Sequence, residues 1–418
     1  MRVLFTTWAW PSHLYPMVPF AWALQAAGHE VRVATTAGLV DAVNRAGLTA
    51  VDIGPDPDLP GMATRDGLAS WHSQKRWPRD WWSDPRRLNC EQVELLRALG
   101  GKQIRMAEAM ADGLVDLARR WRPDLIIHDA VTFAGAVAGA VTGAPTVATM
   151  WGSTAVPRNE RELGTDQPLP EYHALFEPFG VEPRWDPVFW LDPCPPSLRV
   201  PGPHRRVSYR YVPYNGPGSM PAWVLDPVTR PRVCLTWGVT SGRIGAGAAA
   251  ALPETLTALA KLGVEVLLAV TPGQLDALGK LPKEVVAAGP IPLHQVLPTC
   301  AAVVHQGGGG TTMTAAVCGT PQVILSPRPE QMMTGDRLED VGAGLHLAQN
   351  DFAEGLGEAI GEAVARILDD PRFREQAMAL RAEMLAQPSP ADLVPELCAV
   401  ADSQGHTGDA VRHERQRR

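Results

Sequence analysis

The stretch that decides the fold is Ala302-Val303-Val304-His305-Gln306-Gly307-Gly308-Gly309-Gly310-Thr311-Thr312. Ala302–His305 is apolar enough for a short buried strand, and Met313–Cys318 has the composition of a helix that Gly319 would end. Where a strand runs through glycines into a helix, unobstructed backbone N–H groups lie at the helix N-terminus, and the helix dipole there favours an anion. The stretch therefore predicts a phosphate-binding turn; the alternative is a flexible turn that binds nothing.

Two common nucleotide-binding patterns are absent. A Walker loop needs a Lys directly after its glycines, and here Thr311 follows them. The dinucleotide fingerprint GxGxxG would follow the first strand of the chain, where Trp8–Tyr15 stands instead. An NAD-dependent oxidoreductase is therefore only a weak alternative.

Strand and helix patterns alternate on both sides of the glycines, which is typical of doubly wound parallel α/β sheets. In the first half we expect strands at Val3–Thr7, Glu30–Thr35, Leu125–His128 and Thr146–Thr149, and helices at Met17–Ala27, Arg105–Trp121 and Thr132–Val141. In the second half we expect strands at Val233–Thr236 and Val264–Ala269 and near Val285, Val303 and Val323, with a helix at Leu252–Leu262. The two series predict two Rossmann-like domains of similar layout.

Prolines mark the boundary between the halves. Regular periodicity is lost from about Trp151 to Pro231, which suits an irregular interdomain connection. We therefore divide the chain into an N-terminal Rossmann-like domain with this connection, 1–220, and a C-terminal Rossmann-like domain, 221–385. Residues 386–418 form a C-terminal segment and polar tail, for which packing back on the N-terminal domain is one option.

The composition excludes several classes of protein. Of the 418 residues, 45% are hydrophobic and 20% are charged, as in soluble globular proteins, so widespread disorder is not expected. The net charge of −7 offers no broad basic field for nucleic acid or an anionic membrane. The six Cys residues form no CxxC pair, and no apolar run approaches 18 residues. These features predict a cytoplasmic protein without a disulfide framework, a zinc site or a membrane span.

A histidine and an aspartate are candidates for acid–base chemistry. His13 follows the first expected strand, at the sheet edge where ligands of open α/β sheets collect. Asp129 ends the expected strand Leu125–His128 and should emerge at the same edge, where it could orient the imidazole as the acid of a catalytic triad does. The alternatives are an Asp129 that caps the next helix and a His13 that only bonds backbone.

Several motifs, in order along nearly the whole chain, resemble those of family-1 glycosyltransferases of the GT-B fold. The N-terminal block of that family resembles Ser12-His13-Leu14-Tyr15-Pro16, Pro19-Phe20-Ala21-Trp22-Ala23-Leu24 and Gly28-His29-Glu30-Val31. Its glycine-rich loop and later elements resemble His305–Thr312, Gly319-Thr320-Pro321, Pro329-Glu330-Gln331 and Gly342-Ala343-Gly344. The resemblance implies two Rossmann-like domains facing a central cleft, with the acceptor bound mainly in the first and the nucleotide sugar in the second.

The resemblance also implies roles for particular residues. His13 is the general base with Asp129 as its partner, and Glu330 and Gln331 hydrogen-bond the sugar. The residues implied for the diphosphate are Thr240, His305, Gly308, Gly309, Gly310 and Thr311, and those for the nucleotide base are Pro292, Leu293 and Val296. The chain departs from the family pattern at Gln306, where a second His is common, and at Glu330, where Asp is frequent. Because Glu is one methylene longer, the usual pattern of sugar hydroxyls is in doubt.

Within this family, the chain most resembles actinobacterial antibiotic glycosyltransferases that act on macrolides or anthracyclines. The similar segments are Ser12-His13-Leu14, Val207–Gly216 and Val233-Cys234-Leu235-Thr236. This likeness implies inverting transfer of a deoxysugar from a dTDP-sugar to a hydroxyl of a polyketide. In several such enzymes it also implies a cytochrome P450-like auxiliary protein. The sugar, the aglycone, linkage to oxygen, nitrogen or carbon, and the oligomeric state, a homodimer included, stay open.

Tryptophan is concentrated in the first half, where 12 of the 13 residues precede position 230. Trp8 and Trp10 lie beside His13 and are acceptor-binding candidates, because indole rings offer a large apolar area to a flat or greasy polyketide. Ordinary packing is the favoured interpretation of the remaining cluster, Trp71, Trp77, Trp81 and Trp82.

We expect no cofactor and no metal. Asp56-Pro57-Asp58 matches the DxD metal motif of the other glycosyltransferase fold, but prolines surround it and it precedes no phosphate loop. Without a metal, the charge of a leaving diphosphate would fall to the amides of the glycine turn, the helix dipole and His305.

The remaining alternatives are a non-catalytic nucleotide-sugar-binding or partner protein of the same fold, and a sugar-nucleotide epimerase. A phosphorylase of this fold would need a Schiff-base Lys, and no Lys follows Lys283.

Overall fold

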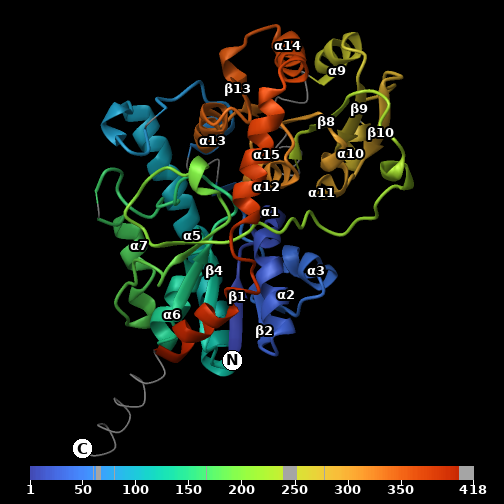
Figure 1. Cartoon of the computed structure of the whole chain (residues 1–418). Helices are drawn as coiled ribbons and strands as arrows, with labels where there is room; N and C mark the ends of the chain where they lie inside the picture. The colour runs from blue at the N-terminus through green and yellow to red at the C-terminus, as the bar shows by residue number, and fades with distance from the viewer. Residues whose placement is uncertain are drawn as a thin grey trace, which may run out of the picture.

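The computed structural model contains two parallel β-sheets, each covered by helices on both faces (Figure 1). It describes residues 1–59, 61–62, 67–79, 81–165, 167–238, 252–276 and 278–403. The first sheet has the strand order β3-β2-β1-β4-β5-β6-β7 and the second the order β10-β9-β8-β11-β12-β13. In both sheets the order reverses beside the first strand, so each contains the switch point at which open α/β sheets bind ligands. The expected architecture of two Rossmann-like domains is confirmed.

The elements of the first domain run from the N-terminus to the interdomain connection. Its strands are β1 (Arg2–Thr6), β2 (Glu30–Thr35), β3 (Ala50–Asp52), β4 (Leu125–Asp129), β5 (Thr146–Thr149), β6 (Trp190–Asp192) and β7 (Arg206–Ser208). Its α-helices are α1 (Pro11–Leu14), α2 (Val18–Ala26), α3 (Ala37–Arg45), α5 (Cys90–Trp121), α6 (Ala134–Thr142) and α7 (Pro170–Ala174). Short 3₁₀ segments are η1 (Tyr15–Met17), η2 (Leu68–His72), η3 (Pro85–Arg87), η4 (Glu177–Phe179), η5 (Pro196–Leu198) and η6 (Ala222–Leu225).

The second domain repeats this layout. Its strands are β8 (Arg232–Thr236), β9 (Glu265–Ala269), β10 (Val285–Gly289), β11 (Ala302–His305), β12 (Gln322–Ser326) and β13 (Gly344–Ala348). Its helices are α9 (Leu252–Lys261), α10 (Pro272–Asp276), α11 (Leu293–Val296), α12 (Gly309–Cys318), α13 (Pro329–Asp340), α14 (Leu356–Asp369) and α15 (Arg372–Leu385), with the 3₁₀ segments η8 (Leu297–Thr299) and η9 (Gln349–Asp351).

The central strands are apolar because both faces of each sheet are buried. In β1, Val3 and Phe5 join the core under α2 and α3, while Leu4 joins the core under α5 and α6. Side chains of a strand alternate between faces, so consecutive apolar residues are needed where both faces are covered. The run of apolar residues in β1 thus indicated a buried parallel strand correctly.

Four strands, several helices and half of α5 were not predicted. The strands are β3, β6, β7 and β13, of which β6 and β7 lie within the proline-rich connection, where three-residue strands give no usable periodicity. The longer helices that were not predicted are α3, α13, α14 and α15. Helix α5 begins at Cys90 rather than Arg105, with Asn89 as a capping residue. Because glycine disfavours a helix, Gly100 argued against extending the predicted helix to its true start. Glycine is nevertheless required at this position, because a Cβ would collide with the carbonyl of Asn159.

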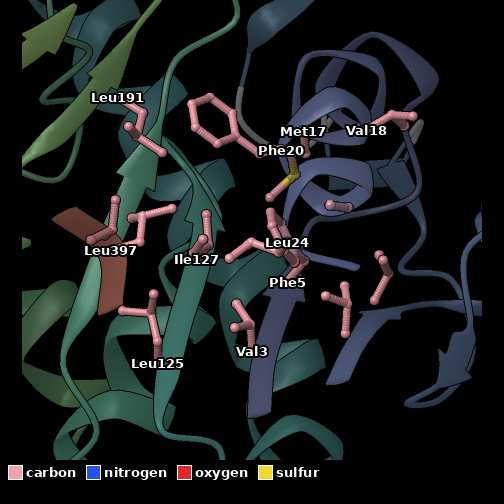
Figure 2. Close-up of a cluster of buried hydrophobic side chains, with 14 of the residues drawn as sticks. Val3, Phe5, Met17, Val18, Phe20, Leu24, Leu125, Ile127, Leu191 and Leu397 are labelled. Carbon is pink, nitrogen blue, oxygen red and sulfur yellow. The ribbon is translucent and has the colours of Figure 1, made fainter. Parts of the chain in front are cut away.

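The C-terminal part of the chain returns to the first domain. Helix α15 contacts α12 in the second domain, and a further helical segment, 394–403, follows. Leu393, Val394, Leu397 and Val400 belong to the same buried cluster as Val3 and its neighbours. Figure 2 shows Leu397 among Leu125, Ile127 and Leu191 of that cluster. The chain therefore crosses between the domains twice.

The first crossing is the interdomain connection itself, drawn in yellow-green in Figure 1. Its Tyr211 hydroxyl donates to the carbonyl of Gly310 over 3.4 Å, and Asn215 Nδ2 donates to Thr314 Oγ1 over 3.3 Å. The connection is thereby bonded to α12, the helix that follows the glycines. Within the described parts of the chain, no helix combines the length and the apolar character that crossing a bilayer requires.

Candidate active site

Two neighbouring strands of the first sheet bring His13 and Asp129 together. β1 and β4 pair in parallel with Thr6 opposite His128, so the loop after β1 and the last residue of β4 lie at the same edge. The single-turn helix α1 starts with Pro11, whose fixed φ suits the first helical position, and it carries His13. His13 Nδ1 lies 2.8 Å from Asp129 Oδ1. The structure therefore brings the two residues together, as the sequence predicted.

The carboxylate of Asp129 is held from both sides. Its second oxygen, Oδ2, accepts hydrogen bonds from the Val131 N–H over 3.2 Å and from Thr132 Oγ1 over 2.9 Å. The Asp129 side chain is 1% exposed, whereas that of His13 is 15% exposed. A fixed carboxylate accepts the proton of Nδ1 and leaves Nε2 of the imidazole free to accept another. Asp129 also bonds the start of the next helical region, so the orienting and the capping interpretations both apply.

Indole rings enclose the imidazole. The ring of Trp8 lies 5.1 Å from that of His13, and the ring of Trp151 lies 4.6 Å from it. Trp10 stacks on Trp8 at 5.1 Å. These rings give the exposed edge of His13 an apolar surround, which a hydrophobic hydroxyl-bearing molecule would complement.

The glycine turn has the geometry expected of an anion site. Gly307 has φ 81°, a left-handed value that favours glycine, and a Cβ there would lie 2.8 Å from Ile324 Cγ2. Gly308 is the N-cap of the ten-residue helix α12, and no side chain caps the helix. The first backbone bond of the helix runs from Thr312 N to Gly308 O, at 2.9 Å. The N–H groups of Gly309, Gly310 and Thr311 therefore point out of the helix end.

Trp151 joins this turn to His13. It is the second residue after β5, and besides its ring contact with His13 its backbone oxygen lies 2.6 Å from the position of a Cβ on Gly309. The adjacent Gly152 packs against Met313 of α12. One residue therefore touches both the imidazole of the first domain and the helix N-terminus of the second.

His305 differs from the expectation that its ring contacts the diphosphate. The side chain is fully buried, with Nδ1 accepting from the Gly307 N–H over 3.1 Å and Nε2 lying 2.8 Å from Gln322 Oε1. Both ring nitrogens are thus used inside the protein. Complete burial lowers the pKa of His305 to about 4, although the bond to Gln322 acts in the opposite direction. His305 is a neutral support that shapes the turn from beneath.

Three buried polar atoms near the turn have no partner in the described part of the chain: Gln306 Oε1, Glu330 Oε2 and Gln331 Nε2. The Cβ of Gln331 lies 3.3 Å from the position of a Cβ on Gly307, so the start of α13 adjoins the turn. Arg328 Nε lies 3.2 Å from both Glu330 Oε1 and Gln331 Oε1. Buried polar atoms are normally bonded, so this group fits a polar ligand beside the turn.

The residues suggested for the nucleotide base are only partly suited to it. Val296 is fully buried in a cluster with Leu293 and Cys300, so its side chain is not available. Pro292 adjoins Gly218 of the interdomain connection, at 2.7 Å from the position of a Cβ there. Thr240, the further phosphate candidate, lies outside the described residues.

Asp56 and Asp58, which match the DxD motif but were not expected to bind a metal, are hydrogen-bonded within the protein. Asp56 Oδ1 accepts from Thr36 Oγ1 over 2.5 Å and from the Gly38 N–H over 3.1 Å at the start of α3. Asp58 Oδ1 accepts from the Gly61 N–H over 3.0 Å. Across the described residues, no three His, Cys, Asp or Glu side chains gather in a way that could hold a metal ion.

Sequence reasoning missed Trp151, Thr132 and Arg328. Trp151 was assigned to the start of the irregular connection, but its place two residues after a strand, at the edge that carries His13, was a usable signal. Thr132 and Arg328 follow the same rule, since each lies just beyond the end of a parallel strand.

Two Rossmann-like domains, one carrying an oriented histidine and the other a free helix N-terminus, define the GT-B class of glycosyltransferases. Comparison with known proteins agrees. A family model described as "Erythromycin biosynthesis protein CIII-like, N-terminal domain" matches residues 22–238, and the model of the corresponding C-terminal domain matches residues 253–400. The chain belongs to this erythromycin biosynthesis protein CIII-like family and is a glycosyltransferase.

Individual relatives cover nearly the whole chain. The 3-alpha-mycarosylerythronolide B desosaminyl transferase of Saccharopolyspora erythraea is 36% identical over 94% of this chain and 97% of its own length. The TDP-daunosamine transferase DnrS of Streptomyces peucetius is 36% identical over 99% of this chain and 100% of its own length. The resemblance to antibiotic deoxysugar glycosyltransferases is thus confirmed.

Solved structures show the same fold. The crystal structure of glycosyltransferase VinC in complex with dTDP has a TM-score of 0.80 and 32% identity, covering 96% of this chain and 100% of that one. The spinosyn rhamnosyltransferase SpnG complexed with spinosyn aglycone has a TM-score of 0.80 and 30% identity, covering 95% of this chain and 100% of that one.

The contact between Trp151 and Gly309 can be tested with a pair of alanine substitutions. Gly309→Ala would place a Cβ 2.6 Å from the Trp151 oxygen, whereas in Gly310→Ala the nearest atom, the Tyr211 hydroxyl, is 3.7 Å away. We expect Gly309→Ala to lower the free energy of unfolding by about 1–3 kcal/mol and Gly310→Ala to leave it unchanged or raised. Urea unfolding measures both, and equal stabilities would rule out the close approach.

The burial of neutral His305 makes stability depend on pH. Its folded pKa of about 4 lies below the ordinary value of 6.5, so the unfolded chain binds the extra proton between these pH values and stability falls as pH drops. From pH 7.5 to 5.0 this residue should remove about 2 kcal/mol. His305→Asn, which keeps an acceptor for Gly307, should lose less over the same range. Urea midpoints at the two pH values provide the measurement, and an identical loss in both proteins would contradict a buried neutral ring.

Proposed function

We propose that the protein transfers a deoxysugar from a dTDP-sugar to a hydroxyl group of a polyketide aglycone, with inversion at the anomeric carbon. The observation that carries the proposal is the bond between His13 and Asp129 beside a free helix N-terminus, joined through Trp151. The relatives add support, because several are named as transferases of deoxysugars and the related structures named above include complexes with dTDP and with an aglycone.

In the proposed reaction, Nε2 of His13 accepts the proton of the acceptor hydroxyl. Asp129 holds the ring in the tautomer that leaves Nε2 free, and it stabilises the imidazolium that forms. The acceptor oxygen forms a bond to the anomeric carbon from one face while the bond from that carbon to the diphosphate oxygen breaks on the opposite face. A single displacement of this kind inverts the anomeric centre.

The leaving diphosphate is assigned to the N-terminus of α12. The N–H groups of Gly309, Gly310 and Thr311 and the helix dipole stabilise its negative charge without a metal ion. Because His305 is buried and neutral, it contributes by holding the Gly307 N–H and the shape of the turn. The backbone amides and the helix dipole, rather than the His305 ring, would therefore stabilise the charge of the diphosphate.

The two substrates are assigned to opposite sides of Trp151. Glu330 Oε2 and Gln331 Nε2, which have no partners among the described residues, would bond the sugar beside the turn. Trp8, Trp10 and Trp151 would contact the aglycone near His13 with an apolar surface.

The test is a pair of substitutions at the proposed base. His13→Ala should bind dTDP with unchanged affinity, measured by calorimetry, and lose turnover to an O-linked product by about a hundredfold or more. Asp129→Asn should also lose turnover, because an amide can favour the wrong tautomer. His173→Ala, at an exposed histidine of α7, is the matched control and should behave as the unaltered protein.

Unchanged turnover in His13→Ala would remove His13 from the mechanism. If the unaltered chain forms no product from donor and aglycone, the same assay is repeated after co-expression with a cytochrome P450-like protein. Binding of dTDP with no transfer under either condition would favour a non-catalytic nucleotide-sugar-binding protein.

A further inference from the structure

A segment of the first domain lies on the sugar-side helix of the second. This segment, defined here as residues 67–79, 81 and 82 and called the Trp-rich segment, precedes α5 and is drawn in light blue beside α13 in Figure 1. Trp71, Trp77 and Trp81 are buried in one cluster with Met332 and Met333 of α13. The ring centroid of Trp77 lies 6.4 Å from that of Trp71 and 5.2 Å from that of Trp81. The Trp cluster is therefore packed between the domains.

Backbone hydrogen bonds fix the position of this segment. The Gln74 N–H donates to the carbonyl of Pro327, the residue after β12, over 3.1 Å. The carbonyl of Gln74 accepts from Asn350 Nδ2 over 3.0 Å. Two loops of the second domain thus hold the same residue of the first.

Charged groups reinforce the contact. Arg76 Nη1 lies 3.0 Å from Asp336 Oδ1, and the Arg76 N–H donates to Asp351 Oδ1 over 3.2 Å. Arg79 donates to the Asp336 carbonyl over 3.1 Å and to Asp340 Oδ1 over 2.6 Å. The Asp336 side chain is only 5% exposed, whereas that of Arg76 is 39% exposed. A carboxylate so deeply buried depends on its partners, because an unpaired buried charge is strongly unfavourable.

Asp336 is also bonded from inside the second domain. His346 Nδ1 lies 2.7 Å from Asp336 Oδ1, and His346 Nε2 lies 2.6 Å from Ser326 Oγ. The order Ser–His–Asp is that of a hydrolytic triad, but Ser326 is 0% exposed, so no substrate can reach its hydroxyl. The three side chains instead tie α13 to β12 and β13. Burial acts to raise the pKa of Asp336, but the bond from His346 and the charge of Arg76 help to lower it below the ordinary value.

The helix held in this way begins with the proposed sugar residues. Glu330 and Gln331 lie in the first turn of α13, and Asp336 follows Glu330 by six residues, about 9 Å along the helix axis. The glycine turn belongs to a different helix, α12, and makes none of the contacts described for Arg76. A shift of α13 would therefore move the sugar contacts relative to a diphosphate that stays in place.

We propose that Arg76, on the acceptor-binding domain, is a positioning residue for the donor sugar: through Asp336 it holds α13 so that Glu330 and Gln331 meet the sugar. This inference rests on the proposed function, which assigns those two side chains to the sugar. It gives the first domain a part in choosing the donor, in addition to binding the acceptor.

The experiment compares the affinity for dTDP with that for a dTDP-sugar. The probe is the member of a panel of dTDP-6-deoxyhexoses that the unaltered protein binds most tightly relative to dTDP. Arg76→Ala should leave the dissociation constant for dTDP within about twofold and raise that of the probe about tenfold or more, with an equal rise in KM for the donor and none for the acceptor. The Arg76 side chain contacts Asp336 through Nη1 and also lies 3.5 Å from Asp351 Oδ2 through Nε. Arg76→Lys keeps the charge but not the forked guanidinium that makes both side-chain contacts, so it should fall between.

Two controls separate positioning from general damage. Arg97→Ala removes an exposed ion pair with Glu162 in the same domain and should change neither constant. In Arg76→Ala the buried carboxylate of Asp336 keeps only His346 and Arg79, whose Nε lies 3.5 Å from Asp336 Oδ2. Arg76→Ala/Asp336→Asn removes this less well compensated charge while the amide oxygen can still accept from His346, so the folded state should recover stability. Weakened probe binding should persist in this double variant, because the contact between the Arg76 side chain and residue 336 is still missing, although Gln74 and Arg79 still contact the second domain.

The outcomes distinguish this inference from the proposed function. If Glu330→Ala weakens probe binding but folded Arg76→Ala binds the probe and dTDP as the unaltered protein does, the positioning role is wrong and the proposed function stands. If restoring stability in the double variant also restores probe binding, Arg76 acts only through stability and the inference fails. If Glu330→Ala leaves probe binding unchanged, the assignment of the sugar site fails, and this inference fails with it.

Discussion

The hydrogen bond between Asp129 and His13 is the interaction on which the proposed chemistry depends. It exists because β1 and β4 are parallel neighbours, so the loop after one and the end of the other must emerge at the same edge of the sheet. Asp129 is fixed by Val131 and Thr132 before it meets the imidazole, which leaves the ring little orientational freedom. Trp151 then sets where this edge meets the second domain, because its ring lies on His13 and its backbone lies on Gly309.

The two domains treat charge differently. In the proposed mechanism the imidazole of the first domain gains a charge during the reaction, and the buried carboxylate of Asp129 compensates for it. The second offers only backbone N–H groups and a helix dipole at the glycine turn, with His305 kept neutral by burial. In the proposed mechanism such a preorganised site would stabilise the leaving group without rearranging at the moment of reaction. Contacts across the interface through Trp151 and Arg76 keep the two halves in register.

Sequence reasoning recovered the features that depend on local pattern. The sequence patterns of β2 and β5 predicted the bounds of these strands correctly, and the rule that ligands gather at strand ends predicted that His13 and Asp129 lie together. It could not recover features that depend on distant packing. The inward orientation of His305 is set by Gln322 on the next strand, and the site of the Trp-rich segment is set by Met332 and Met333 about 250 residues later in the chain. Strands such as β6 and β7 are three residues long, and the sheet rather than their own composition makes them strands.

A crystal structure of the protein with dTDP bound tests the central claim most directly. The account predicts that oxygens of the terminal phosphate lie about 3 Å from the N–H groups of Gly309, Gly310 and Thr311. It also predicts that Trp151 remains between Gly309 and His13, and that Nε2 of His13 faces the side of the diphosphate from which the sugar would project. A diphosphate bound away from the N-terminus of α12, or a His13 that has left Asp129 and turned from the nucleotide, would contradict it.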